Sequence, residues 1–332
     1  MVLACVLAAG VTLALASAGP VSAATLDQLS DRTHKATMLG RLGFHPKLVF
    51  FGGSRSMRLE PSYAYQRWGL RGFNAAVQGC KHEDVWALMH HMVRRAPKQK
   101  KHVVWGIQPG AFFSNQIFDV GLIRDERLRR YFPSDVRATQ GDGLAHRWAN
   151  RTYVRDGAVV YDNFDRKEAA GRTLSESLAI YIRRALRQRS DADTIPATIT
   201  RTRRYFEKTL AYMNEHGCEP LLIIMPIHPK VIRAVRDEHW DNRRASFAEY
   251  LAALQEIHRF TVLDFTFISS FDGDPAAFYD GVHMKRANVR RFLRTAVRKA
   301  PWAFGRAPSP WDRPAPAPTS TPTPEESSAP VL

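Results

Sequence analysis

A serine that follows a predicted buried strand is the leading candidate for a nucleophile in this sequence. Residues 48–57 read LVFFGGSRSM, an apolar run that ends at Gly52 and Gly53 and is followed by Ser54. The run predicts a strand buried on both faces, and the glycines allow a tight turn at its end. The turn would present the Ser54 hydroxyl as a nucleophile and its N–H as a donor to a developing oxyanion. A loop that only closes a strand is the alternative.

Ser56 is a second candidate nucleophile, two residues further on. It has no glycine turn directly before it, so turn geometry favours Ser54. Arg55 and Arg58 lie beside these serines. Because positive charge at the start of a helix opposes the helix dipole, both arginines are candidates for binding an anionic substrate group. An ion pair with a carboxylate such as Glu60 explains them equally well.

A serine hydroxyl is a weak nucleophile without a base, and the chain offers one after its last predicted strand. Residues 280–283 read DGVH. On a turn, the Asp280 carboxylate could hold one imidazole nitrogen of His283, which leaves the other nitrogen to face Ser54. An incidental polar loop is the alternative, because the chain contains 12 histidines.

Two more polar residues are candidates for contacting the substrate. Asn74 begins the segment NAAVQG, and His228 lies in the sequence PIHP directly after the strand predicted at 221–225. For Asn74 the alternative is support of the serine turn. For His228 the alternative is a structural histidine in a loop.

Four short motifs occur in a fixed order along the chain: GGS ending at Ser54, residues 74–79, GIQ ending at Gln108, and residues 280–283. Together they resemble the four sequence blocks of the SGNH (GDSL-like) hydrolase superfamily, in islands between residues 46 and 298. The closest resemblance is to the extracytoplasmic branch that handles acyl groups on cell-surface polymers. That branch includes alginate O-acetylation proteins and the protein involved in D-alanylation of teichoic acids.

The resemblance implies a role for each matching residue. Ser54 matches the nucleophile, His283 the base and Asp280 the carboxylate that orients the base. The N–H of Gly79 and the side-chain amide of Gln108 match oxyanion donors that act beside the N–H of Ser54.

Two positions depart from the family pattern. Gly53 replaces the familiar aspartate before the serine, and Gln108 is one methylene longer than the usual asparagine. Its amide could therefore miss the oxyanion, and the loss of one donor costs on the order of 3 kcal/mol, about a hundredfold in rate. A backbone N–H near Gly110 is the alternative donor.

The elements that must position these residues alternate between strands and amphipathic helices. Strands are predicted at 48–51, 102–107, 221–225 and 261–267. Helices are predicted at 82–95, 174–186, 200–216 and 286–298, and Ser246 with Glu249 forms a capping box ahead of one more. This alternation predicts an α/β fold, a three-layer sandwich with a mainly parallel central sheet, as in SGNH and flavodoxin-like proteins. Ligand sites in such folds lie at the carboxyl ends of the strands.

Three regions are predicted along the chain. Residues 1–24 are apolar, without charge, and end in small residues, which is typical of a signal peptide, although no basic residue precedes them. They are also long enough to serve as a membrane anchor, so the body is expected outside the cytoplasm. Residues 25–304 would form the SGNH-like domain, with 111–195 as an inserted helical lid. Residues 305–332 are rich in Pro, Ser and Thr and predict a disordered tail.

Composition restricts the partners. The formal net charge is +16, with 48 Lys and Arg against 32 Asp and Glu, which suits an anionic cell-envelope polymer or a solvated basic surface. No zinc-finger spacing or RNA-binding aromatic motif is present, so no nucleic acid is expected. Cys80 and Cys218 are predicted to be unpaired, and the sequence predicts neither a cofactor nor a metal site.

The resulting expectation is an extracytoplasmic serine esterase or O-acyltransferase. Its substrate would be an acyl ester, with acetyl as the expected group, of a cell-surface or secreted polysaccharide, or else a small ester. The alternative is a catalytically inactive polysaccharide-binding or assembly protein on the same fold.

Overall fold

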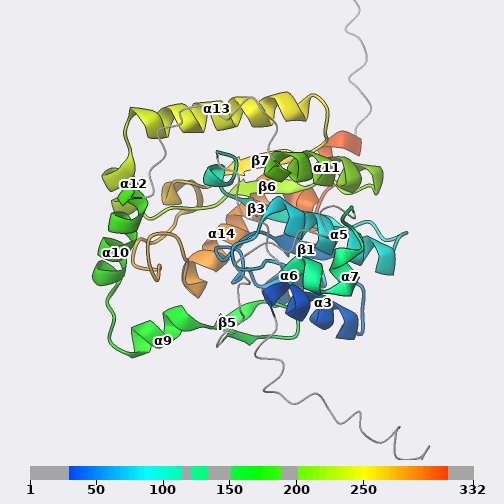
Figure 1. Cartoon of the computed structure of the whole chain (residues 1–332), viewed down its shortest axis with the longest axis horizontal. Helices are drawn as coiled ribbons and strands as arrows, with labels where there is room; N and C mark the ends of the chain where they lie inside the picture. Colours follow the sequence, from blue (N-terminus) through cyan, green and yellow to red (C-terminus); the bar gives the residue numbers. More distant parts are fainter. Residues whose placement is uncertain (1–29, 114–120, 134–150, 188–200, 313–332) are drawn as a thin grey trace, which may run out of the picture.

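A parallel sheet lies at the centre of the molecule (Figure 1). The computed structural model describes residues 30–113, 121–133, 151–187 and 201–312. In spatial order the five strands are β2 (Gly72–Asn74), β1 (Leu48–Phe51), β3 (His102–Ile107), β6 (Leu221–Ile224) and β7 (Thr261–Asp264). Every neighbouring pair is parallel. The predicted α/β fold with a mainly parallel central sheet is therefore confirmed.

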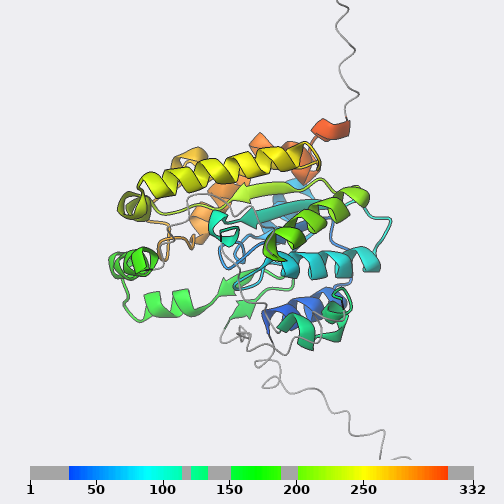
Figure 2. The same ribbon diagram turned by 45° about the horizontal axis from the view of Figure 1, so that its top comes forward.

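Alternate side chains of each strand enter two separate cores. In β1, Val49 and Phe51 belong to one core, and Leu48 and Phe50 belong to the other. The first core lies under α3 (Asp31–Arg41), α5 (His82–Arg95), α11 (Arg201–Glu215) and α13 (Glu238–Gln255). The second lies under α4 (Pro61–Trp68) and α14 (Arg286–Lys299). Figure 2 shows α5, α11 and α13 in front of the sheet, so helices cover both faces.

Most predicted elements agree with the structure to within a few residues. α5 and β3 lie where the periodicity places them, and α11, β6 and α14 differ by one or two residues. The predicted helix start at Ser246 is wrong, because α13 begins eight residues earlier. There Asp237 caps the helix by accepting the N–H of Trp240 at 2.8 Å. The sequence did not predict β2, α4 or α12 (Pro229–Val235).

The predicted lid at 111–195 divides into two parts that lie apart (Figure 1). α6 (Gly121–Arg124) and α7 (Glu126–Arg129) pack against α3 and α5, and their leucines enter the first core. The second part, residues 151–187, is here named the cap. It contains β4 (Thr152–Tyr153), β5 (Val159–Tyr161), α9 (Asn163–Ala169) and α10 (Leu174–Arg187). The prediction of one helical lid is corrected accordingly, since the cap begins with an antiparallel hairpin.

The prediction of a disordered tail at 305–332 is wrong for its first eight residues. The Ser309 hydroxyl donates a hydrogen bond to the buried carboxylate of Glu219, and η4 (Pro310–Asp312) follows. Residues 305–312 are therefore ordered, while 313–332 and the predicted signal or anchor at 1–24 lie outside the described residues. In the part of the chain that the structure describes, every helix is too short or too polar to span a bilayer.

The order of the strands defines a switch point. From β1 the chain passes to β2 on one side of β1, and then to β3 on the other side. Ligands of open α/β sheets bind outside the carboxyl ends of the strands at such a point. Ser54 follows β1 and Gln108 follows β3, so both residues lie at the position that this rule selects.

Candidate active site

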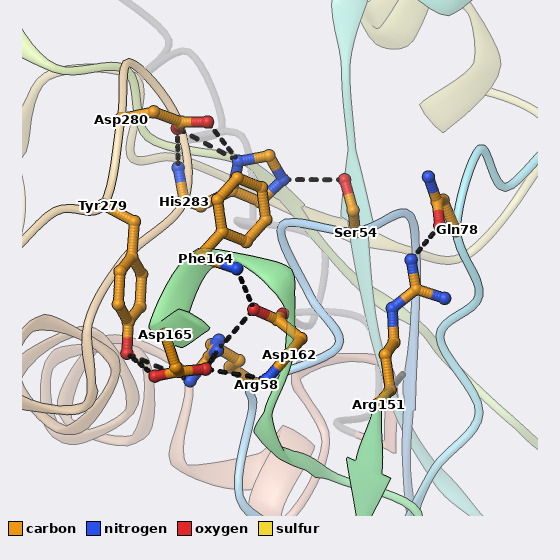
Figure 3. A network of polar contacts seen from close by, with 10 residues as sticks. All are labelled: Ser54, Arg58, Gln78, Arg151, Asp162, Phe164, Asp165, Tyr279, Asp280 and His283. Carbon is orange, nitrogen blue, oxygen red and sulfur yellow. Dashed lines mark hydrogen bonds and ion pairs between the residues drawn. The ribbon is translucent and has the colours of Figure 1, made fainter. Parts of the chain in front are cut away.

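Ser54, His283 and Asp280 form a continuous chain of hydrogen bonds (Figure 3). The Ser54 hydroxyl donates to Nε2 of His283 across 2.9 Å. Nδ1 of His283 donates to the Asp280 carboxylate, at 3.0 Å from Oδ1 and 2.9 Å from Oδ2. Because the carboxylate holds the proton on Nδ1, Nε2 is left to accept the serine proton. The fold thus joins two residues that are 229 positions apart in the chain.

The Asp280 carboxylate is held by its own turn. Its Oδ1 accepts the backbone N–H groups of Val282 at 2.8 Å and of His283 at 2.9 Å. Burial alone would raise the pKa of Asp280, but the hydrogen bond and charge of His283 and the two N–H donors outweigh it. The net result lowers the pKa to about 2. Asp280 is therefore ionised at neutral pH and can stabilise an imidazolium.

The serine turn depends on close approach at Gly52. This residue has φ +133°, a backbone conformation that residues with a side chain rarely adopt. A Cβ there would lie 2.7 Å from the carbonyl oxygen of Gly106 and would overlap the Ser56 hydroxyl. The N–H of Ser56 donates to the Gly53 carbonyl at 2.8 Å and closes the turn. The chain can therefore reverse directly after β1 and leave Ser54 at its edge.

Ser56 is not placed to act as the nucleophile. It is fully buried, and its hydroxyl points to the sulfur of Met225 at 3.8 Å. Ser54 is partly exposed and bonds to the imidazole of His283. The choice of Ser54 over its neighbour agrees with this geometry.

The three predicted oxyanion residues line one small pocket of about 200 Å³. Gly79 has φ +59°, and Ser54 and Gln108 complete the pocket wall with it. Nε2 of Gln108 lies 3.2 Å from the point where a Cβ on Gly53 would be. The longer glutamine side chain therefore still reaches the turn that carries Ser54.

Helix α3 fixes the loop that contains Gly79. Asp31 accepts the N–H of Gln78 at 2.9 Å, and Arg32 donates to the Gln78 carbonyl at 2.9 Å. Arg32 also forms a fully buried ion pair with Asp84 at 2.8 Å. This role could not be predicted from the sequence, because charged residues in a polar segment look the same whether folding buries them or leaves them in solvent. Asp31 and Arg32 are therefore positioning residues for the pocket.

We expect Arg32→Ala to destabilise the protein by about 3–5 kcal/mol, because it leaves the Asp84 carboxylate buried without its ion-pair partner. Urea unfolding at neutral pH measures this change. Arg41→Ala, on the exposed last turn of the same helix, is the control and should cost less than about 1 kcal/mol. Equal losses for the two variants would contradict the role given to the buried pair.

The prediction that Asn74 contacts the substrate is wrong. Asn74 is fully buried, and its amide nitrogen donates to the carbonyls of Ser56 and Leu59, each at 2.8 Å. Its amide oxygen accepts the N–H of Ala76 at 2.9 Å. The side chain therefore ties β2 to the segment after the serine turn, which is the structural alternative.

The prediction that His228 binds substrate is also wrong. It is buried, and Nδ1 accepts the N–H of Lys230 at 3.1 Å while Nε2 donates to the Pro275 carbonyl at 3.1 Å. Burial lowers the pKa of His228, which fits this neutral form. Its backbone N–H donates to the Gly281 carbonyl at 2.9 Å. His228 therefore supports the turn that carries His283.

The two arginines beside the serines have different surroundings. Arg58 pairs with Asp162 at 2.9 Å and with Asp165, both in the cap, rather than with Glu60. Arg55 has no carboxylate partner among the described residues, and the hydroxyl of Tyr181 lies 3.5 Å from its guanidinium. Arg55 therefore remains a candidate for contacting substrate, whereas Arg58 does not.

The cap is attached beside the relay through a polar network (Figure 3). The Tyr279 hydroxyl donates to Asp165 at 2.5 Å, and the Arg58 guanidinium lies 4.6 Å from the centre of the Tyr279 ring. Burial would raise the pKa of Asp165, but the hydrogen bonds from Tyr279 and Arg58 lower it overall. The Phe164 ring packs on His283, with 4.2 Å between ring centres. No sequence motif pointed to Phe164, because contact across 119 positions leaves no local pattern.

We expect Phe164→Ala to lower kcat/KM for an ester by up to about tenfold, because packing of two rings contributes roughly 0.5–1.5 kcal/mol. The pH profile of kcat/KM should change with it, since the ring covers one face of the imidazole. Asn163→Ala, an exposed neighbour in α9, should leave both unchanged. A normal rate in the Phe164 variant would show that the ring has no part in placing His283.

The remaining predictions concern metals and cysteines. Cys80 and Cys218 are both free thiols. Among the described residues, no three His, Cys, Asp or Glu side chains are grouped so that they could hold a metal ion.

No known family model matches the chain, and no curated protein matches it significantly. Any assignment of function therefore depends on the chemistry of the site itself.

Proposed function

We propose that this protein is a serine esterase or O-acyltransferase of SGNH type that acts on acyl esters of a polysaccharide. One observation carries the proposal. A partly exposed serine, an imidazole and an ionised carboxylate are linked in series at the switch point of a parallel sheet. Buried structural histidines, such as His228, bond to backbone groups instead.

In the first half-reaction, His283 takes the proton of Ser54 as the hydroxyl oxygen attacks the ester carbonyl. The developing oxyanion is stabilised by the N–H groups of Ser54 and Gly79 and by the amide of Gln108. The intermediate collapses, and the protonated His283 gives its proton to the departing alcohol. Asp280 holds the imidazolium throughout.

In the second half-reaction, His283 removes a proton from an incoming hydroxyl, which attacks the acyl-enzyme. Water yields the free acid, and a sugar hydroxyl yields a transferred ester. The same residues serve both outcomes, so the occupant of the acceptor position decides between hydrolysis and transfer.

Two features support an anionic polymer outside the cytoplasm as the setting. The net charge is +16, and residues 1–24 have the composition of an export signal or anchor. Recovery of the protein in the periplasmic, membrane or secreted fraction after expression supports this placement. Recovery only in the cytoplasm contradicts it.

The direct test of the activity uses the purified chain and two reagents. A fluorophosphonate probe should label the protein covalently, and p-nitrophenyl acetate should be hydrolysed in a time course that a prior incubation with the probe abolishes. Mass spectrometry of the labelled peptide should find the adduct on the segment that contains Ser54. Absence of both labelling and hydrolysis rejects the proposal.

A further inference from the structure

A second cavity, of about 390 Å³, lies beyond Gln108 from the small pocket at the serine. It shares Gln108 and Gly110 with the small pocket at the serine, and Arg55, the residue after Ser54, lies on its wall. This volume falls within the range of pockets that enclose small ligands. The cavity therefore adjoins the site rather than lying remote from it.

The wall of this cavity is predominantly apolar. The apolar residues of the wall lie near the carboxyl ends of β3 and β6 or in the helices α12 and α13. They include Phe113, Ile224, Met225, Ile227, Val235 and Trp240. Arg244 also lines it, but Asp264 pairs with its guanidinium at 2.6 Å, and the guanidinium lies 4.9 Å from the centre of the Trp240 ring. Arg55, Gln108, Arg243 and Thr266 are further polar members of the wall, but an apolar ligand group would gain from burial against its apolar side chains.

The position of His283 decides which part of an ester would enter the cavity. The departing alcohol must lie beside the imidazole, because the imidazole returns the proton to it. His283 does not line the cavity, but Gln108, on the oxyanion side, does. The cavity therefore lies on the acyl side of the carbonyl.

We propose that this cavity is an acyl-chain subsite and that the preferred substrates are esters of apolar acids larger than acetic acid. The inference rests on the proposed function and replaces the acetyl group that the family resemblance implies. An acetyl group would leave the cavity empty, whereas a longer apolar chain would lie along the wall that Gln108, Val235 and Trp240 share. Each buried methylene should increase kcat/KM by roughly fourfold.

The test is a series of p-nitrophenyl esters from acetate to decanoate, which keeps the departing group constant. For the native protein we expect kcat/KM for hexanoate to exceed that for acetate by at least about tenfold. Val235→Trp fills the cavity and should lower the ratio of hexanoate to acetate rates by about tenfold or more. Ala234→Trp, the exposed neighbour in α12, should leave the ratio unchanged.

Trp240→Ala provides a second variant that enlarges the cavity and should move the optimum to longer chains. Faster turnover of acetate than of hexanoate would overturn the subsite while leaving the esterase proposal in place. An equal effect of Val235→Trp and Ala234→Trp on the ratio would overturn it as well. If no ester in the series is turned over and no probe labels Ser54, both the esterase proposal and the subsite are rejected.

Discussion

Replacing Ser54 by alanine should abolish turnover, with a loss on the order of 10⁶-fold in kcat. In the proposed mechanism the Ser54 hydroxyl oxygen becomes acylated, and the neighbouring Ser56 offers no substitute for it, since Ser56 is buried against Met225. Hydrolysis of p-nitrophenyl acetate and labelling by a fluorophosphonate should disappear together. The fold should persist, because the one hydrogen bond that the Ser54 side chain forms among the described residues is to His283.

Ser56→Ala is the matched control for this experiment. It removes a hydroxyl two residues away, from the same turn, without touching the relay. Activity and labelling should survive in this variant. The opposite result, loss with Ser56→Ala and retention with Ser54→Ala, would move the nucleophile and contradict the arrangement in Figure 3.

Asp280→Asn should lower kcat by about 10⁴-fold while leaving the site assembled. Asparagine keeps the shape of the side chain, but its amide can donate to Nδ1 and so favours the proton on Nε2. In that tautomer His283 cannot accept the proton of Ser54. The rate of ester hydrolysis at neutral pH measures the loss. Asp272→Asn, an exposed neighbour with φ +56° that asparagine tolerates, is the control.

The same variant should change how stability depends on pH. The pKa of Asp280 falls from 3.8 to about 2 on folding, so the native state holds the carboxylate ionised more strongly than the unfolded state does. Its contribution, about 2 kcal/mol, is present above pH 4 and is lost as the pH falls through 2. Denaturant titrations between pH 2 and 5 should show this loss in the native protein. The part due to Asp280 should be missing from Asp280→Asn.

Strong local patterns explain what the sequence predicted well. The run LVFF before two glycines, and the helical spacing over 82–95, each involve many residues that satisfy one period. Ser54 was recognisable because it follows the buried strand β1 and its two glycines, and the DGVH turn was recognisable because an aspartate and a histidine stand three positions apart in it. These features identified the sheet and the three members of the relay.

Contacts between distant segments explain what the sequence could not predict. Asn74 and His228 are polar residues near the site, yet their side chains form hydrogen bonds with backbone groups and not with a ligand position. Arg32 and Asp84 look like surface charges until folding buries them together. Phe164 belongs to the cap, and its ring reaches His283 only when the cap folds against the turn that carries this histidine. In each case the partner lies far along the chain or in an element without periodicity.

The way the cap is attached has a consequence for how this sequence can change over time. α9 buries no residue and α10 buries only Leu178, while ion pairs fasten the cap beside Ser54. Segments with so few buried apolar contacts contribute little to global stability and can open without unfolding the rest. Substitutions on these two helices should therefore be tolerated by the sheet while altering what can approach the serine. Over evolution, substitutions in α9 and α10 could therefore change which acceptor molecule reaches Ser54, while the residues of the proposed mechanism stay the same.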